Sequence, residues 1–238
     1  MYFPTTHWSV LADASLSGDA HESRALDDFV RRYRTPIINF IRARGWPPDE
    51  AEDLAQEFFL HVIRKGTLSR ADATRGRFRS YIRGTLARFL ASARVHANAE
   101  KRGGGAPLFS LDHDALPEQA VAIPPEEAAR FDHDWAVHLL ELSVARVEEK
   151  YSEDGRLDDF KLLRRYLPGG SDTPTYADGA AQLGLSMGAF KTEVHRVRRT
   201  LRENLLQEVS LTIDSPHEID LEMQHLQRAL AGESGIAM

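Results

Sequence analysis

Apolar residues recur at steps of three and four along nearly the whole chain, whereas alternating apolar and polar residues are hard to find. Steps of three and four gather side chains on one face of an α-helix, while alternation gathers them on one face of a strand. The chain is therefore predicted to be all-α. Its 238 residues, of which 42% are hydrophobic and 28% charged, are enough for two small globular domains.

Three helices are predicted in the first part of the chain, at residues 20–44, 49–64 and 77–100. Pro36 lies inside the first of them and is expected to bend or break it, because proline lacks a backbone donor and clashes with the preceding turn. Asp49 and Glu50 lie in the first turn of the second helix, where the helix dipole favours negative charge. We expect these helices to form a first domain over residues 1–102.

Glycine and proline then interrupt the helical pattern. Gly103, Gly104 and Gly105 are followed by Pro107 and, further on, by Pro125. This composition is typical of a flexible linker, predicted at residues 103–130. A second helical domain is expected at residues 131–210. An acidic extension over residues 211–238 is expected to carry one short helix that starts at Ser215.

The net charge of −6 hides a strongly uneven distribution. Residues 70–102 hold nine basic and two acidic residues, and residues 186–202 hold five and one. Residues 103–159 hold four basic and fourteen acidic residues, and residues 203–238 hold one and seven. Because local patches rather than net charge select partners, the two basic segments favour a nucleic-acid partner.

The strongest local motif lies at residues 175–207. Thr175 and Asp178 have the spacing of a capping box at the start of a short helix. Gly184 is expected to make a sharp turn, Leu185 to fill the angle between two helices, and Ser186 to cap the second helix. This is the layout of a helix-turn-helix.

The second helix of this motif has two faces. Its apolar side is expected to face the core and comprises Met187, Phe190, Val194, Val197, Leu201 and Leu205. Its basic side comprises Lys191, His195, Arg198, Arg199 and Arg202. Such a helix can enter a major groove and neutralise phosphates. A solvated basic face without a ligand is the alternative, and the caps and the glycine turn favour the DNA-binding interpretation.

Little in the sequence points to catalysis. The chain has no cysteine, which excludes disulfides and thiolate metal sites. It has no His-Glu-x-x-His pattern and no Gly-x-x-x-x-Gly-Lys phosphate loop. We therefore expect no catalytic residue, no metal ligand and no cofactor. The N-terminus lacks the pattern of a secretory signal and no stretch is apolar enough to span a membrane, so the cytoplasm is the expected location.

Several segments together resemble the extracytoplasmic-function (ECF) sigma factors of bacterial RNA polymerase. Residues 49–62 resemble region 2.2 of that family, residues 76–90 the following segment, and residues 176–206 region 4; residues 5–10 look like the start of one subgroup. The resemblance implies two helical domains, a region 2-like bundle and a region 4-like helix-turn-helix, joined by the linker. It implies core RNA polymerase and promoter DNA as partners, and it allows an anti-sigma factor as another.

The resemblance assigns polymerase binding to an acidic helix that docks on the clamp coiled coil of the core enzyme. The residues it assigns are Asp49, Glu50, Asp53, Leu54, Gln56, Glu57 and Leu60. Four of them follow the i, i+3, i+4, i+7 spacing that places side chains on one helix face. A solvated acidic face is the alternative interpretation.

Binding and opening of the minus-ten promoter element falls to the third helix and the residues just before it. The assigned residues are Arg75, Arg77, Arg79, Tyr81, Arg83, Arg88 and Arg94. Arginines with interleaved aromatic residues suit a single strand with unstacked bases, although most of these aromatics, Phe89 especially, are expected to be core. Tyr81 and Arg88 stand where the family has tryptophan and asparagine.

Reading of the minus-thirty-five element falls to the helix-turn-helix. The assigned residues are Ser186, Gly188, Lys191, Thr192, His195, Arg196 and Arg199. The predicted function is therefore promoter recognition and transcription initiation as a sigma factor. The alternatives are an operator-binding regulator that acts without polymerase docking, and a factor that binds polymerase but not DNA.

The acidic extension carries a narrow apolar stripe formed by Ile219, Met223, Leu226 and Leu230. A helix this short is marginal alone in water, so it is expected to pack on another surface. Its negative charge favours the basic recognition helix as that surface, in an autoinhibitory contact. A partner protein, or a simple extension of the core of the C-terminal domain, are the alternatives.

Overall fold

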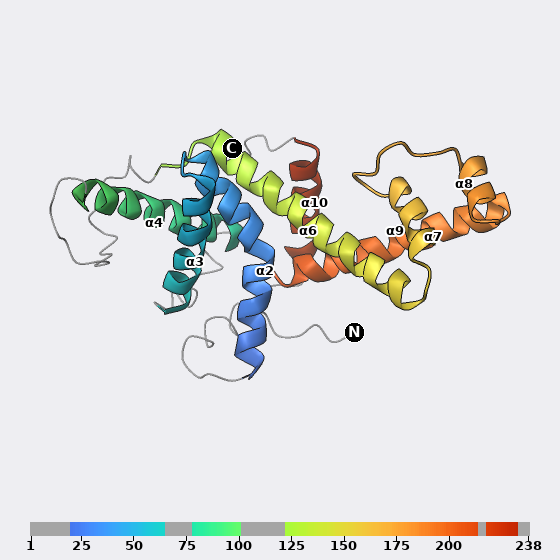
Figure 1. The fold of residues 1–238 in the computed structure, drawn as a ribbon, viewed down its shortest axis with the longest axis horizontal. Helices are drawn as coiled ribbons and strands as arrows, with labels where there is room; N and C mark the ends of the chain where they lie inside the picture. The colour runs from blue at the N-terminus through green and yellow to red at the C-terminus, as the bar shows by residue number, and fades with distance from the viewer. Residues whose placement is uncertain (1–19, 65–77, 101–121, 214–217, 233–238) are drawn as a thin grey trace. The chain divides into compact units, whose positions relative to one another are not determined.

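The computed structural model describes residues 20–64, 78–100, 122–213 and 218–232, and within these ranges the chain is helical and contains no strand (Figure 1). The helices are α2 (Ala20–Ala43), α3 (Pro48–Arg64), α4 (Phe78–Glu100), α6 (Pro125–Glu153), α7 (Leu157–Leu163), the 3₁₀ turn η4 (Arg164–Tyr166), α8 (Tyr176–Gln182), α9 (Met187–Ser210) and α10 (Ile219–Leu230). The all-α prediction is confirmed. None of these helices is both long and apolar enough to cross a membrane.

The first three described helices begin and end within one residue of the predicted bounds. The predicted break at Pro36 does not occur, since α2 continues through it to Ala43. Pro36 and the two residues after it, Ile37 and Ile38, are buried. Packing of this apolar face therefore holds the helix together although proline removes one backbone hydrogen bond.

The chain divides into two compact units whose boundary lies inside α6. The first unit consists of residues 1–138 together with residues 211–238, and the second of residues 139–210. This division differs from the expected one, because α6 already begins at Pro125, inside the expected linker, and α10 belongs to the first unit rather than to a separate extension. The expected cap of the last helix at Ser215 lies outside the described residues.

The core of the first unit is rich in aromatic side chains. The rings of Phe29 and Phe78 lie 5.8 Å apart and those of Phe29 and Phe59 lie 5.4 Å apart, both edge to face. Phe131, from the start of α6, packs edge to face on Phe40 at 5.7 Å. Edge-to-face pairs of this kind add to the free energy gained by burying the rings. They join α2, α3, α4 and the first part of α6.

The core of the second unit centres on three rings that contact one another. Tyr166, Tyr176 and Phe190 have ring centroids 5.3–5.9 Å apart. A Cβ added at Gly179, which lies in α8, would come within 2.5 Å of the Phe190 ring, so only glycine fits there. This close approach fixes α8 against α9.

Candidate nucleic-acid interface

The helix-turn-helix predicted at residues 175–207 is present in the second unit. The Thr175 hydroxyl accepts a hydrogen bond from the backbone N–H of Asp178 at 3.2 Å and donates one to the Asp178 carboxylate at 2.7 Å. Gly184 has a φ of +63°, a left-handed conformation that glycine adopts without strain. The Ser186 hydroxyl accepts a hydrogen bond from the backbone N–H of Ala189 at 3.2 Å and so caps α9.

Two apolar residues at the turn are not where the sequence pattern places them. Leu185, expected to fill the angle between the two helices, is 38% exposed, and Met187, expected to face the core, is 45% exposed. The apolar stripe of α9 is covered only from Phe190 onward, where Phe190 is fully buried and Val194 is 1% exposed. Periodicity identifies the apolar stripe of a helix, but it does not say how far along the helix other elements cover that stripe.

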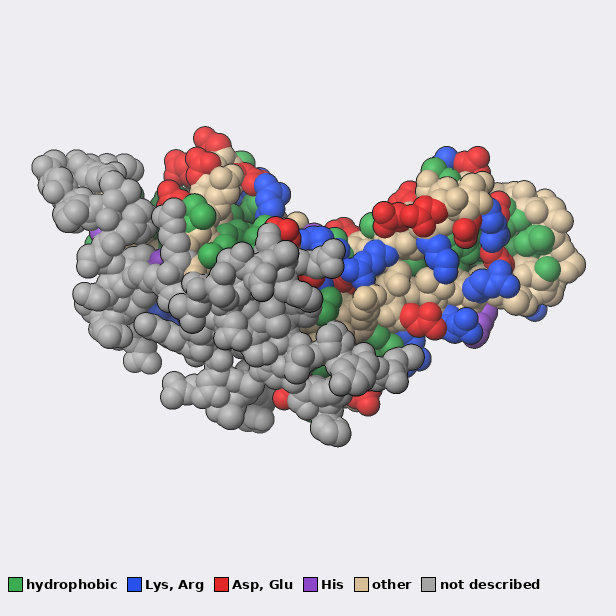
Figure 2. All heavy atoms as spheres, turned by 90° about the horizontal axis from the view of Figure 1, so that it is seen from below, with side chains coloured by type: hydrophobic (Ala, Val, Ile, Leu, Met, Phe, Trp, Pro, Cys, Tyr) green, Lys and Arg blue, Asp and Glu red, His purple; other side chains and the backbone are tan. Residues whose placement is uncertain are grey.

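The opposite side of α9 is open to solvent. Every residue that was assigned to reading the minus-thirty-five element is exposed: Ser186, Gly188, Lys191, Thr192, His195, Arg196 and Arg199. Lys and Arg side chains are visible on the surface of this unit in Figure 2. The structure thus brings these seven residues to one helix and leaves all of them accessible.

Several of these side chains have partners within the unit. The Thr192 hydroxyl donates to the backbone oxygen of Gly188 at 3.0 Å, and Arg199 lies 3.5 Å from Glu203. Arg198, expected on the basic face, instead directs its guanidinium to the backbone oxygen of Tyr166 at 2.9 and 3.0 Å. It satisfies a carbonyl at the end of the 3₁₀ turn η4, so its role is at least partly structural.

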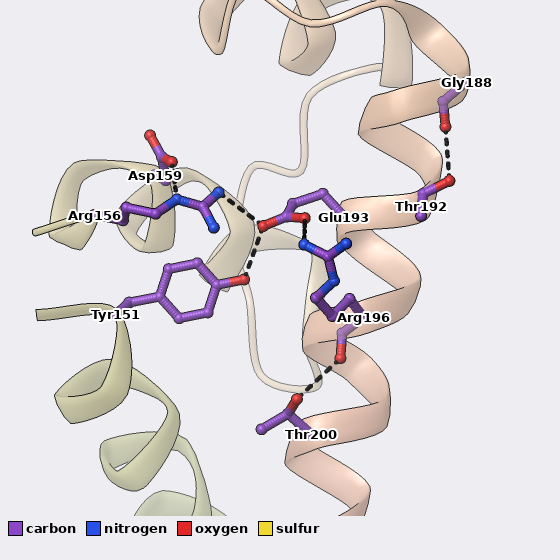
Figure 3. A network of polar contacts seen from close by, with 8 residues as sticks. All are labelled: Tyr151, Arg156, Asp159, Gly188, Thr192, Glu193, Arg196 and Thr200. Carbon is purple, nitrogen blue, oxygen red and sulfur yellow. Dashed lines mark hydrogen bonds and ion pairs between the residues drawn. The ribbon is translucent and has the colours of Figure 1, made fainter. Parts of the chain in front are cut away.

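A buried carboxylate lies behind this face and was not identified from the sequence. Glu193 is 6% exposed and accepts hydrogen bonds from Tyr151 at 3.2 Å, Arg156 at 2.7 Å and Arg196 at 2.6 Å (Figure 3). Arg156 is also bound to Asp159 at 2.8 Å. Glu193 is the one acidic residue in the basic segment 186–202, and this isolated negative charge is the sequence feature that could have pointed to a buried carboxylate. It holds Arg196 on the surface of α9.

This network also affects the ionisation of Tyr151. Burial, together with the nearby negative charge of Glu193, raises the pKa of Tyr151 to about 12. The neutral phenol can donate a hydrogen bond to the carboxylate, whereas a phenolate would repel it. The network therefore joins a neutral tyrosine, the carboxyl group of Glu193 and two arginines.

The acidic face predicted on α3 is present in the first unit. Asp49, Glu50, Asp53, Gln56 and Glu57 are exposed, Leu60 is 48% exposed, and Leu54 is half-buried. The opposite side of α3 packs in the core, where its buried residues are Ala51, Ala55, Phe58, Phe59 and Val62. The helix thus presents an acidic stripe that ends in an exposed leucine.

The residues assigned to the minus-ten element are not all accessible. Arg75 and Arg77 lie outside the described residues. Arg88 and Arg94 are exposed and Tyr81 is half-buried, while the neighbouring rings Phe78 and Phe89 are core, as expected.

Arg79, which was assigned to DNA, is buried in this structure, with only 3% of the residue exposed. It binds Asp132 at 2.9 Å, forms an ion pair with Glu222 on α10, and its guanidinium lies 4.2 Å from the centroid of the Trp135 ring. Burial alone would lower the pKa of Arg79, but the two carboxylates outweigh it and raise the pKa. Arg83 shares Asp132, also at 2.9 Å.

The tail helix α10 packs on the core of the first unit. Its buried residues Glu222, Leu226 and Ala229 belong to the first unit, not to the helix-turn-helix unit. The tail helix therefore packs within the first unit, and its expected contact with the basic recognition helix stays a prediction. One basic partner of the tail within the first unit is the buried Arg79, which pairs with Glu222.

The described residues contain no group of three or more histidine, aspartate or glutamate side chains placed to hold a metal ion. What they do contain is a capped helix-turn-helix with an exposed basic face and a separate helical bundle with an acidic face. These features are those of a helical DNA-binding protein.

Residues 29–95 match the family model described as Sigma-70 region 2. In this segment the chain is therefore similar to region 2 of the sigma-70 factors. The matched segment contains α3 and most of α2 and α4. No curated protein and no solved structure matched the chain.

Proposed function

We propose that this chain is a sigma factor of the ECF type, which docks on core RNA polymerase through α3, opens the minus-ten element with α4 and reads the minus-thirty-five element with α9. The observation that carries the proposal is the occurrence of a sigma-70 region 2 and a capped helix-turn-helix in one chain. In this role the chain acts where the polymerase acts, in the cytoplasm.

The exposed face of α3 supports polymerase docking. Asp53 and Glu57 lie one turn apart and point to solvent, and Leu60 extends the stripe with an apolar contact. A partner helix that carries arginines would complement this surface. Electrostatic complementarity of this kind speeds association and fixes the register of two partners.

Fewer residues of α4 are accessible for a DNA contact than the sequence suggests. With Arg79 buried and Arg83 bound to Asp132, the described residues that remain accessible to an open strand are Tyr81, Arg88 and Arg94. We propose that Arg88 and Arg94 contact phosphates and that Tyr81 contacts a base. Arg75 and Arg77, just before the helix, remain part of the proposed contact set.

The strongest alternative is a regulator that binds an operator through α9 without docking on polymerase. Such a protein needs two half-sites, and therefore a dimer, to reach high specificity. Operator binding through α9 requires neither the acidic stripe on α3 nor a bundle of the region 2 type. The region 2 match favours the sigma factor over this alternative.

Run-off transcription with core polymerase on genomic DNA tests the proposal. We expect discrete transcripts when the full chain is added and none with core polymerase alone. The start sites should share two conserved elements at the spacing that a polymerase holoenzyme spans. Sequence-specific DNA binding without core polymerase, combined with an absence of new transcripts, would instead support the operator-binding regulator. An anti-sigma partner can be sought separately by pull-down from a lysate.

A further inference from the structure

The first residue of the recognition helix is an exposed methionine, at a position where a base-reading helix presents a side chain to the groove. Met187 opens α9 directly after the Ser186 cap, and 45% of its surface is exposed. A buried methionine would need no explanation, but this one leaves a flexible apolar side chain in water at the tip of a basic helix.

The neighbours of Met187 leave it unobstructed. A Cβ added at Gly188 would meet nothing within 4 Å, so the surface beside the methionine is open backbone. The Ser186 hydroxyl is already used to cap the helix. The Thr192 hydroxyl donates to the backbone oxygen of Gly188. The hydroxyls near Met187 are therefore already engaged within the helix, and the methionine side chain is the exposed apolar group at the N-terminal end of α9.

The polar groups of α9 lie further along the helix. Arg196 is held by the buried Glu193 at 2.6 Å, and Arg199 lies 3.5 Å from Glu203. Lys191 and His195 follow Met187 at steps of four and share one row with it along the helix. The row thus starts with an apolar group and continues with basic ones.

In a helix-turn-helix the N-terminal residues of the second helix contact base edges, and the later basic residues contact phosphates. The one apolar group that a base pair presents in the major groove is the C5-methyl of thymine. Resting on the proposed function, we infer that Met187 is a specificity-determining residue that reads a thymine methyl group in the minus-thirty-five element.

The chemistry of methionine and that of the base edges both favour a contact between Met187 and a thymine methyl group. A methionine at this position has no hydrogen-bond donor and only a weakly accepting sulfur, so it gains nothing from the O6 or N7 acceptors of guanine and little from the amino group of cytosine. Against a thymine methyl it removes apolar surface from water on both partners. The basic groups behind it, Lys191 and His195, hold the helix on the backbone without themselves selecting that base pair.

The test compares thymine with deoxyuridine, which pairs identically and lacks only the methyl group. Holoenzyme made from the full chain and core polymerase first selects duplexes from a random DNA library. Each thymine of the selected upstream element is then replaced singly by deoxyuridine, and binding is measured. At one thymine we expect about fourfold weaker binding by the wild type, the effect of losing one buried methyl group.

Substitutions at position 187 test whether Met187 causes the difference between the thymine and deoxyuridine duplexes. Met187→Ala should bind the thymine duplex about as weakly as the wild type binds the deoxyuridine duplex, and it should no longer distinguish the two. Met187→Leu, which keeps an apolar side chain, should still distinguish them. Leu185→Ala is the matched control, because it removes an equally exposed apolar residue of the turn and should leave the discrimination intact. All these positions are exposed, so folding should not be affected.

Two results overturn the inference while leaving the sigma factor assignment in place. One is a wild-type holoenzyme that is insensitive to deoxyuridine at every thymine of the upstream element. The other is a Met187→Ala holoenzyme that keeps the full sensitivity, because another residue would then read the methyl group. Failure of the chain to select any DNA with core polymerase overturns the proposed function and this inference together.

Discussion

Arg79 and Glu222 lie 143 residues apart in the sequence and form an ion pair in which the side chains are only 4% and 7% exposed. The guanidinium also binds Asp132 and lies on the face of Trp135. An arginine that the sequence pattern assigned to promoter DNA is thus held inside the first unit by the tail helix. This pair makes α10 part of the folded unit that contains sigma region 2.

Removing the acidic partner should destabilise the first unit. Glu222→Ala would leave a buried arginine with one carboxylate instead of two, and loss of one member of a buried ion pair costs about 3–5 kcal/mol. Denaturant unfolding followed by tryptophan fluorescence measures this, since the two tryptophans among the described residues, Trp46 and Trp135, lie in the first unit. Leu221→Ala, at a 57% exposed neighbour on the same helix, should change stability by less than about 0.5 kcal/mol. Equal effects of the two substitutions would contradict a specific role for the pair.

Deletion of the residues after Ile213 distinguishes two roles of the tail helix, a structural role in the first unit and an autoinhibitory role in DNA binding. The deletion removes Leu226 and Ala229 from the core as well as Glu222, so we expect a clearly lower melting temperature of the first unit and no gain in promoter binding. Differential scanning calorimetry and holoenzyme binding assays measure the two quantities. Tighter promoter binding with an unchanged melting temperature would restore the autoinhibitory interpretation.

Gly179→Ala should destabilise the helix-turn-helix unit. The new methyl group would collide with the Tyr166 hydroxyl and with the Phe190 ring, and overpacking of this kind costs about 1–3 kcal/mol. Gly188→Ala is the matched control, because the new methyl group meets nothing and alanine favours the helix by about 0.5–1 kcal/mol. Thermal unfolding by circular dichroism should move in opposite directions for the two variants. A stable Gly179→Ala protein would mean that α8 does not pack closely on α9.

The Glu193 network predicts an alkaline loss of stability. The pKa of Tyr151 is raised from 10.0 to about 12 in the folded state, so the unfolded chain loses its proton at lower pH than the folded one. The stabilisation that depends on the neutral phenol is complete below pH 10 and is lost as the pH rises from 10 to 12. Denaturant unfolding of the wild type and of Tyr151→Phe at pH 8, 10 and 11 isolates this contribution. Stability curves with the same slope above pH 10 in both proteins would contradict it.

Charge reversal on α3 tests polymerase docking. Asp53→Lys combined with Glu57→Lys should weaken binding to core polymerase at least about tenfold, because like charges would face each other across the proposed interface. Folding should be retained, since both side chains are exposed. Glu148→Lys combined with Glu149→Lys makes the same charge change at two exposed positions on α6 and should leave binding intact. Equal binding by both double variants would remove α3 from the interface.

The sequence was sufficient to predict the bounds of α2, α3 and α4 and the two caps of the helix-turn-helix. Thr175 and Ser186 cap the helices that their spacing indicated, because a cap depends on residues three positions away. The exposed face of α9 was predicted for the same reason, since the period of a helix is a local property.

Long-range features could not be predicted in the same way. The burial of Arg79 depends on Glu222 and Asp132, which are far from it in the sequence, and no local spacing indicates that they meet. The exposure of Met187 depends on where the covering elements end, which periodicity does not encode. Glu193 looked like an interruption of a basic segment, and only the fold shows that it is held by Tyr151 and two arginines.

The inclusion of α10 in the first unit has a consequence for how the protein is made. A ribosome synthesises the chain from its N-terminus, and domains generally fold as units once their residues have emerged. Here the core of the first unit is complete only after residues 219–230 have been synthesised, because Glu222, Leu226 and Ala229 of α10 are buried in it. The helix-turn-helix unit, residues 139–210, is complete earlier and can fold first. A chain that ends before α10 would carry a complete helix-turn-helix unit and an incomplete first unit.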